Sequence, residues 1–385
     1  RWRALSTAAA IRPGAAARFL PARLGPPLLA FLLACIPLAI AAAHKHAGFL
    51  TTGTWFKWDS GWYYNVAQHG YQPLTRCTAG EGGVPGVSLC GNSGWFPGFP
   101  MLVGALYQLG LTGQGYGVAI SWVLDFVLLA VLWNGYLRRV EGPSRYVALA
   151  FAAVAPGGVY LRTAFPMALT ALGLLAALLL ARERRWVAAG LAGAVAAYSY
   201  PTGVLIAPLL ALWALMDSEW PDALLSGALA AGGFLAAIAQ MWAGSGRADA
   251  YFKVQANYSH GITLPFVNWW HLISGHVQQA IVGNEIQAQI EGVLVAVVML
   301  FLTVHVLARL RADRWRLFLL IAGLVLWLAP LTQGNVAYWR SDSLLLAPVS
   351  LLVAALDLRR AVAVTGVTLV AFTILADKFF GGGLT

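Results

Sequence analysis

The segment PPLLAFLLACIPLAIAAA, residues 26–43, contains no charged residue. An apolar run of about 18 residues or more is long enough to cross the hydrocarbon core of a membrane as an α-helix. Arginines precede this run, but it is long for the apolar core of a secretory signal, and no clear small-residue cleavage site stands before His44. The segment therefore predicts a retained transmembrane helix.

Similar apolar segments recur along the chain, without the polar alternation that is typical of outer-membrane strands. Hydrophobic residues make up 59% of the 385 residues and charged residues only 10%, so a water-soluble fold could not cover its own surface with polar groups. We expect an all-α integral membrane protein, folded as one domain over residues 1–385, with roughly 10 to 12 transmembrane helices. After the first, the expected spans lie near residues 116–137, 146–161, 164–181, 186–199, 202–216, 223–242, 291–308, 317–331, 344–356 and 361–376.

The formal net charge of +10 raises the question of a nucleic-acid partner. The basic residues, however, form five clusters between apolar segments, as cytoplasmic topology signals do. We therefore expect no nucleic-acid partner and an N-terminus in the cytoplasm, and the Ala, Gly and Leu bias points to a bacterial plasma membrane. The clusters are Arg1, Arg3, Arg12, Arg18 and Arg23; Arg138, Arg139 and Arg145; Arg182, Arg184 and Arg185; Arg309, Arg311, Arg314 and Arg316; and Arg359 and Arg360.

Two long polar and aromatic loops, at about 44–95 and about 243–290, fall on the non-cytoplasmic side in this topology. Loops of this length are uncommon and are usually functional. Directly after the first loop, residues 96–111 form a short apolar run that contains Pro97 and Pro100. We interpret this run as re-entrant, as interfacial or as a short membrane helix.

Three cysteines are present, and two of them lie in the first loop, where oxidation is favoured if the loop faces away from the cytoplasm. We expect a disulfide between Cys77 and Cys90, and two free thiols are the alternative. Cys35 lies inside the first helix.

The first loop contains WFKWDSGWYYNVAQHGY, residues 55–71, in which Asp59 is the only acid among seven aromatic residues. A carboxylate near a membrane surface is costly unless it is paired or used, and aromatic faces suit sugar rings or lipid headgroups. The alternative is that Asp59 caps a helix that begins at Ser60, while the tryptophans form an interfacial belt.

The order and spacing of four motifs resemble the signature loop of the PIG-V family of polyprenyl-phosphate-mannose-dependent mannosyltransferases. The motifs are Trp58-Asp59, Trp62-Tyr63, His69-Gly70-Tyr71 and WFPGFPML at residues 95–102. That family belongs to the GT-C class of multi-pass enzymes, which transfer a sugar from a lipid phosphate carrier outside the cytoplasm with an acid in the first outer loop. The resemblance implies a GT-C fold and an inverting, single-displacement transfer.

Displacement of a sugar from a phosphate carrier needs one base for the acceptor hydroxyl, because the phosphate leaves as an anion with little acid help. The resemblance implies that Asp59 is this base, and a cation would hold the departing phosphate. Arg340 is the first candidate because it lies at the outer end of a span, where positive-inside bias does not explain it; an interfacial arginine is the alternative. Arg162 and Lys57 are further candidates. Asp342 would pair with Arg340 or cap the next helix.

The remaining candidates would contact the sugar or the acceptor. They are Trp58, Trp62, Tyr63, His69, Tyr71, Trp95 and His260. The histidine spacings do not suit zinc, and Asp59 lacks the second acid of an Asp-x-Asp metal site. We therefore expect no metal and no other cofactor, with a divalent ion as the alternative.

The sequence thus predicts a glycosyltransferase, most specifically a mannosyltransferase, that moves mannose from polyprenyl-phosphate-mannose to a lipid or glycan acceptor at the outer membrane face. Two alternatives stay open: the same fold with another lipid-linked sugar, such as an arabinofuranose, and a non-catalytic transporter or flippase for a lipid headgroup. A transporter would carry functional acids within its spans, where Asp125 is the only clear one.

Overall fold

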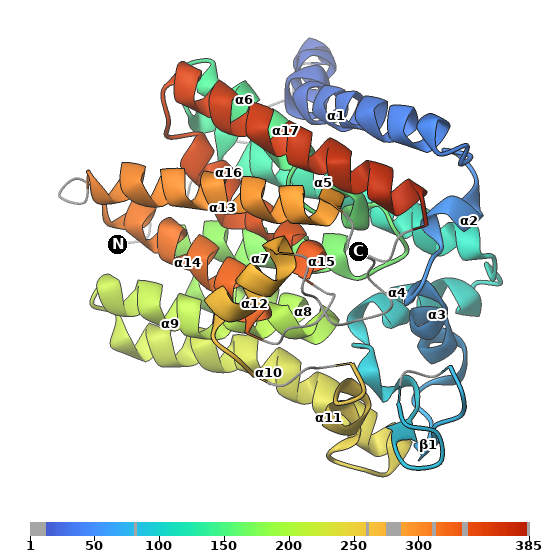
Figure 1. Cartoon of the computed structure of the whole chain (residues 1–385). Helices are drawn as coiled ribbons and strands as arrows, with labels where there is room; N and C mark the ends of the chain where they lie inside the picture. Colours follow the sequence, from blue (N-terminus) through green and yellow to red (C-terminus); the bar gives the residue numbers. More distant parts are fainter. Residues whose placement is uncertain are drawn as a thin grey trace.

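The computed structural model describes residues 13–80, 83–258, 262–274, 286–309, 313–332 and 338–382. Within these ranges the chain is almost entirely helical (Figure 1), and its one sheet is a pair of two-residue antiparallel strands, β1 (Thr75–Arg76) and β2 (Leu89–Cys90). The prediction of an all-α membrane fold is confirmed.

Six of the described helices are long and apolar enough to cross a membrane, and each coincides with a span expected from the sequence. Their exposed surfaces are rich in Leu, Ile and Val, as lipid-facing surfaces are. These helices are α1 (Pro13–His44), α5 (Gln114–Gly135), α10 (Trp220–Ser245), α13 (Ile286–Leu307), α14 (Arg314–Leu331) and α17 (Leu358–Phe380).

The other expected spans are shorter helices, because proline and glycine interrupt them. The segment expected at 146–161 breaks after α6 (Ser144–Ala153), where Pro156 precedes Gly157 in the left-handed conformation (φ 65°). The segment at 344–356 divides into η5 (Ser343–Leu345) and α16 (Leu346–Val353). The remaining short elements here are η2 (Leu137–Arg139), η3 (Gly158–Leu161), α7 (Met167–Arg182), α8 (Trp186–Ser199), η4 (Pro201–Leu205) and α9 (Ile206–Met216).

The short helices α6, α7 and α16 form the interior of the bundle and are largely buried. Small residues allow the closest helix contacts, as is common between helices in membranes. A Cβ added at Gly173 of α7 would lie only 2.9 Å from the backbone nitrogen of Ala196 in α8. A Cβ at Gly190 of α8 would lie 2.8 Å from Leu229 of α10.

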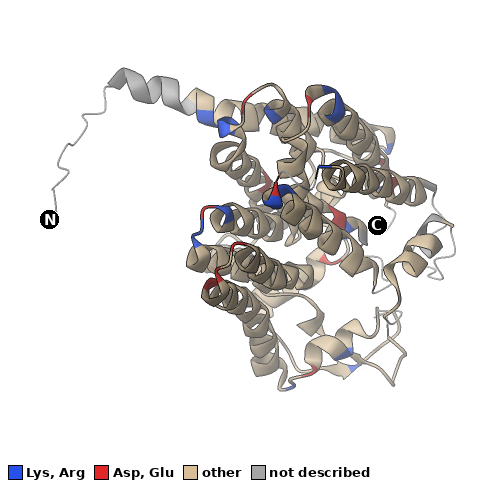
Figure 2. Ribbon diagram, turned by 90° about the vertical axis from the view of Figure 1, so that its left-hand side faces the viewer, with Lys and Arg blue, Asp and Glu red and all other residues tan. Residues whose placement is uncertain are grey.

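Charged residues gather at helix ends on the side of the bundle that faces the viewer in Figure 2, and some of them pair between helices. Arg139 pairs with Glu183 at 3.2 Å, and Arg184 pairs with Asp217 at 3.0 Å. Arg314 donates a hydrogen bond to the last carbonyl of α9, at 3.2 Å. These arginines come from three of the five clusters in the sequence, so these three clusters meet at a shared end.

The opposite end carries the first long loop, whose elements lie on the right-hand side of Figure 1. These are α2 (Thr52–Trp55), α3 (Ser60–His69), β1, β2, η1 (Asn92–Gly94) and α4 (Gly98–Gln108). With 11 residues, α4 is about 16 Å long, roughly half the thickness of the hydrocarbon core. It packs against α3 and α5. The same end receives α11 (Ala250–Gln255), α12 (Pro265–Ile273) and α15 (Tyr338–Asp342).

Candidate active site

Asp59 stands directly before the first turn of α3, but its side chain makes no capping hydrogen bond. The capping alternative that the sequence offered is therefore wrong. The preceding residue, Trp58, has a φ of 46°, a left-handed conformation that is unusual for a bulky side chain. Strained backbone of this kind gathers at functional sites.

The partner of Asp59 is Arg340. Nη1 of Arg340 donates to Oδ2 of Asp59, although the two residues are 281 positions apart in the sequence. Arg340 lies in α15, a single helical turn beside the end of α14. The fold therefore brings together the acid and the first-choice cation that the sequence singled out separately.

Two aromatic rings lie under the Arg340 guanidinium. Its central carbon is 4.9 Å from the ring centre of Phe165 and 5.7 Å from that of Tyr160. These two rings are stacked, with centres 5.8 Å apart and planes within 4°. Cation–π contact and the Asp59 carboxylate thus hold the guanidinium in a defined place.

Three buried tyrosines surround the pair. Burial raises the pKa of Tyr63, Tyr160 and Tyr200, and in each the Asp59 carboxylate raises it further while Arg340 opposes the increase. These phenols stay protonated and can donate hydrogen bonds. Burial lowers the pKa of Arg340, but Asp59, Tyr160 and Tyr200 together raise it more, so Arg340 stays a cation.

The two partners differ in exposure. The Arg340 side chain is 9% exposed, whereas the Asp59 side chain is 27% exposed. The carboxylate is therefore the accessible partner, and a substrate group can reach it without unfolding the site.

An aromatic platform continues from Asp59 along α3. The rings of Trp62 and Trp95 are stacked, with centres 4.5 Å apart and planes within 14°, and Tyr258 meets Trp95 edge-on. Tyr71 donates from its hydroxyl to the Trp95 carbonyl at 2.7 Å, which fixes the platform to the end of the loop. Flat aromatic surfaces of this kind suit the apolar faces of sugar rings.

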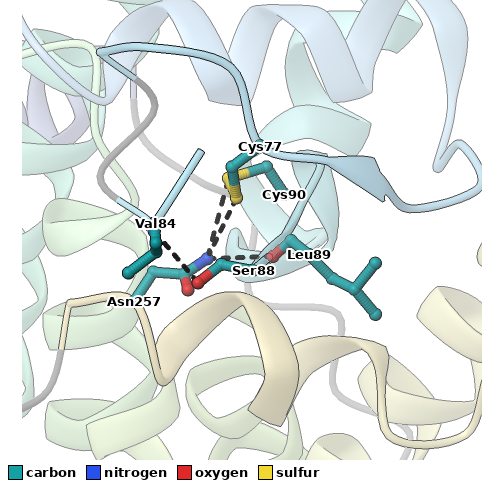
Figure 3. Close-up of a disulfide and its surroundings, with 6 residues drawn as sticks. All are labelled: Cys77, Val84, Ser88, Leu89, Cys90 and Asn257. Carbon is teal, nitrogen blue, oxygen red and sulfur yellow. Dashed lines mark hydrogen bonds between the residues drawn. A yellow bond between two sulfur atoms is a disulfide. The ribbon is translucent and has the colours of Figure 1, made fainter. Parts of the chain in front are cut away.

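Cys77 and Cys90, which the sequence paired, are joined by a disulfide that closes the β1–β2 hairpin (Figure 3). The amide nitrogen of Asn257 lies 3.8 Å and 3.7 Å from their sulfurs and donates to the Leu89 carbonyl at 2.9 Å. The nearby Gln255 donates to the Gly94 carbonyl at 2.7 Å. The second long loop therefore docks on the first beside the platform.

Arg162, predicted to bind donor phosphate, lies elsewhere. Its side chain is completely buried, pairs with Asp125 at 2.9 Å and packs over the Phe31 ring. The phosphate prediction for Arg162 is corrected by this geometry, because the η3 turn directs the side chain into the bundle. This pairing also gives Asp125 a structural partner.

Lys57 and His69 are also removed from the ion pair. Lys57 donates to the Phe379 carbonyl at 2.8 Å, near the end of α17, and burial lowers its pKa. His69 is exposed at the last residue of α3, about 15 Å along the helix from Asp59. The Lys57 ammonium is therefore bound at the end of α17 and the His69 side chain points away from the ion pair, while His260 lies outside the described residues.

Residues that the sequence analysis missed surround Arg340. Tyr160, Phe165 and Tyr200 all lie at helix breaks, and the last two directly precede Pro166 and Pro201. Aromatic residues beside helix-breaking prolines at the same end of several spans are the signal that would have found them.

A second buried charge cluster lies where α15 meets α13 and α17. Asp342 neither pairs with Arg340 nor caps the next helix, and burial raises its pKa to about 8. Glu291 is completely buried within electrostatic reach of Asp342 and Lys378, and the Lys378 ammonium lies 4.6 Å from the ring centre of Trp339. Across the described ranges, no three His, Cys, Asp or Glu residues are grouped as metal ligands.

No protein-family model and no curated protein matches this chain. One solved structure that aligns with this chain is the oligosaccharyltransferase of Archaeoglobus fulgidus, crystallised with a tethered acceptor peptide that contains the NVT sequon. Its TM-score is 0.47 at 14% sequence identity, over 91% of this chain and 55% of that one. The chain thus spans about half the length of that protein.

Proposed function

We propose that this protein is a membrane glycosyltransferase of the GT-C class, which transfers mannose from a polyprenyl-phosphate-mannose donor to a lipid or glycan acceptor. The observation that carries the proposal is the Asp59–Arg340 pair, an accessible carboxylate against a buried guanidinium beside an aromatic platform. The mannose donor is the finer part of the proposal and rests on the resemblance of the motifs between Trp58 and residue 102.

The pair supplies the two groups that this reaction needs. A phosphate that approaches Arg340 competes with Asp59 for the guanidinium, because bidentate Arg–phosphate contacts are at least as favourable as Arg–carboxylate contacts. Binding of the donor therefore releases the carboxylate at the place where a base is required. When no donor is bound, Asp59 stays paired with Arg340, and this pairing keeps the base from other reactions.

The transfer is then a single displacement. Asp59 takes the proton of the acceptor hydroxyl, whose oxygen forms a bond to the anomeric carbon of the sugar as the bond to the phosphate oxygen breaks. The carrier phosphate leaves with the electron pair and stays against Arg340. Because the acceptor attacks from the side opposite the phosphate, the anomeric configuration inverts.

We place the charged end of the bundle on the cytoplasmic side of a bacterial plasma membrane and the Asp59–Arg340 end on its outer face. The platform of Trp62, Trp95 and Tyr258 would hold the sugar or the acceptor. The catalytic residues named here need no metal ion, although a divalent ion is compatible with the same reaction.

The test is transfer by purified protein from synthetic polyprenyl-phosphate-mannose to extracted membrane lipids, with the parent protein, Asp59→Asn and Asp249→Asn. Asp249 is the matched control, because it pairs with Arg247 on the surface at 3.0 Å. Product from the parent and the control, and none from Asp59→Asn, supports the proposal. Equal product from all three removes Asp59 from catalysis.

A donor panel tests the sugar. Turnover of polyprenyl-phosphate-arabinofuranose in place of the mannose donor would keep the reaction and replace the sugar. If the parent neither turns over nor binds any lipid-linked sugar by calorimetry, the glycosyltransferase proposal fails and a headgroup transporter becomes the better reading.

A further inference from the structure

The short helix α12, in the second long loop, has two faces of different character. Phe266, Val267 and Trp270 lie on one face and are 66%, 41% and 60% exposed. Asn268 and Trp269, on the other face, are buried and half-buried. Residues 262–274 contain no Lys, Arg, Asp or Glu. A solvated surface helix of this size would carry charge on its exposed face.

Hydrogen bonds hold α12 across the ends of two candidate spans. Asn268 donates from its side chain to the Leu331 carbonyl at 2.6 Å, and the Thr263 amide donates to the Thr332 carbonyl at 2.9 Å, both at the end of α14. The Trp269 indole donates to the Gly292 carbonyl near the start of α13, at 3.4 Å. In Figure 1 the α12 ribbon lies beside α14 at the end nearer α15.

The exposed face continues onto α13. Val293, Val297 and Leu300 of that helix are 39%, 50% and 64% exposed, and they line the surface of a candidate membrane span. Two apolar residues just before α12, Ile262 and Leu264, are also exposed, at 88% and 71%. Because α12 packs against α13, this surface adjoins the lipid-facing side of the bundle.

We propose that α12 is an interfacial helix, whose Phe266, Val267 and Trp270 face docks into the acyl and headgroup boundary of the lipid bilayer. Its occupant is lipid, because the face lacks charge, carries an aromatic residue at each end and adjoins a membrane span. Interfacial helices of this kind bury their apolar faces about 5–10 Å into that boundary.

The position of α12 at the bilayer surface sets the depth of the candidate site relative to the membrane. Arg340 follows Leu331, the last residue of α14, by nine residues, and α15 packs against α14. A bilayer surface at α12 therefore passes close to the level of Arg340. This consequence rests on the proposed function: the phosphate of a lipid-linked donor would meet Arg340 while its chain stays in the membrane.

The first test needs no activity. Nitroxide labels are placed at Phe266→Cys, Val267→Cys and Trp270→Cys in a Cys35→Ala background and measured in lipid nanodiscs. Val87, 72% exposed on the disulfide hairpin, is the loop reference, and Leu300 is the span reference. We expect all three α12 labels to collide several-fold more with oxygen, relative to a nickel chelate, than the Val87 label, at a depth between the two references.

Labels on α12 that collide with the nickel chelate as often as the Val87 label would overturn the proposal, since the face would then lie in water. Dipolar broadening between singly labelled molecules would also overturn it, because a second copy would then cover the face.

The second test uses Phe266→Ser/Trp270→Ser in the transfer assay. We expect KM for a long-chain donor to rise at least about tenfold with kcat unchanged, a change of about 1.4 kcal/mol, because α12 would no longer hold the site at the level of the donor phosphate. KM for a short, water-soluble donor should not change. An equal rise in KM for both donors would contradict the role of α12 in lipid contact. If the parent protein itself shows no turnover, only the proposed reaction is contradicted.

Discussion

The protein contains two arginine–aspartate pairs of very different character. Arg162 and Asp125 are 0% and 1% exposed inside the bundle, whereas Arg340 and Asp59 are 9% and 27% exposed at its end. Both arginines also lie over aromatic rings. The chemistry of the two pairs is the same, so access to the carboxylate is what separates a structural pair from a candidate catalytic one.

The buried pair joins α5 to Arg162, directly after η3, and η3 itself presents Tyr160 to Arg340. A structural pair thus supports the ring on which the exposed pair rests. Removal of one partner should mainly lower stability in the buried pair and mainly lower turnover in the exposed pair.

The largest effect is expected for Asp59→Asn. Loss of a general base should lower kcat/KM for lipid-linked donor by about 10²–10⁴-fold. The thermal unfolding temperature in detergent should fall less than in Asp125→Asn, because the pair is more exposed and the new amide oxygen still accepts from Arg340. Asp125→Asn is the matched comparison and should lower the unfolding temperature. If Asp59→Asn unfolds as readily as Asp125→Asn, the distinction between the two pairs is lost.

The second effect is on folding. Arg162→Leu should lower the free energy of unfolding by about 3–5 kcal/mol, because it leaves a buried carboxylate without its cation. The double variant Arg162→Leu/Asp125→Leu should recover most of this loss, since it removes both charges. Denaturation of purified protein measures each variant, and a double variant less stable than Arg162→Leu would contradict the account.

Parts of this comparison were predictable from the sequence and parts were not. The apolar segments predicted the six long helices, and the acid-in-aromatic pattern singled out Asp59. Arg340 was selected because topology left its charge unexplained. Their contact across 281 positions could not be read from the sequence, because it depends on how two distant helix ends meet.

The error on Arg162 has a physical origin. Its place at the outer end of an expected span resembled that of Arg340, but Gly157 turns the chain before η3 and the side chain enters the bundle toward Asp125. Side-chain direction after a helix break depends on the backbone turn, which hydropathy does not encode. The same limit hid Tyr160, whose ring packs under Arg340.

A smaller effect is expected for Arg340→Lys. The lysine ammonium keeps the positive charge but loses the planar contacts of the guanidinium with carboxylate, phosphate and the two stacked rings. The loss should be about that of one hydrogen bond to a charged group, about 1.5–3 kcal/mol. We expect kcat/KM to fall by about 10–100-fold, mostly through KM for the donor. Lys57→Arg is the control, since Lys57 contacts a backbone carbonyl, and equal losses for both variants would mean that Arg340 has no special role.

The smallest effect is expected for Trp62→Leu, which tests the platform beside the exposed pair. A stacked aromatic pair contributes about 0.5–1.5 kcal/mol beyond its buried area, so the rise in KM for the sugar donor or acceptor should be about 2- to 12-fold. Trp213→Leu is the comparison from the buried region, where Trp213 packs edge-on against Trp315 at 5.0 Å. That variant should lose stability without a change in KM. Since Trp62 is half-exposed and Trp213 is buried, the two variants repeat the contrast between the ion pairs with uncharged side chains. If Trp62→Leu instead lowers the unfolding temperature and leaves KM unchanged, its stack with Trp95 is structural, and the aromatic surface next to Asp59 does not hold the substrate.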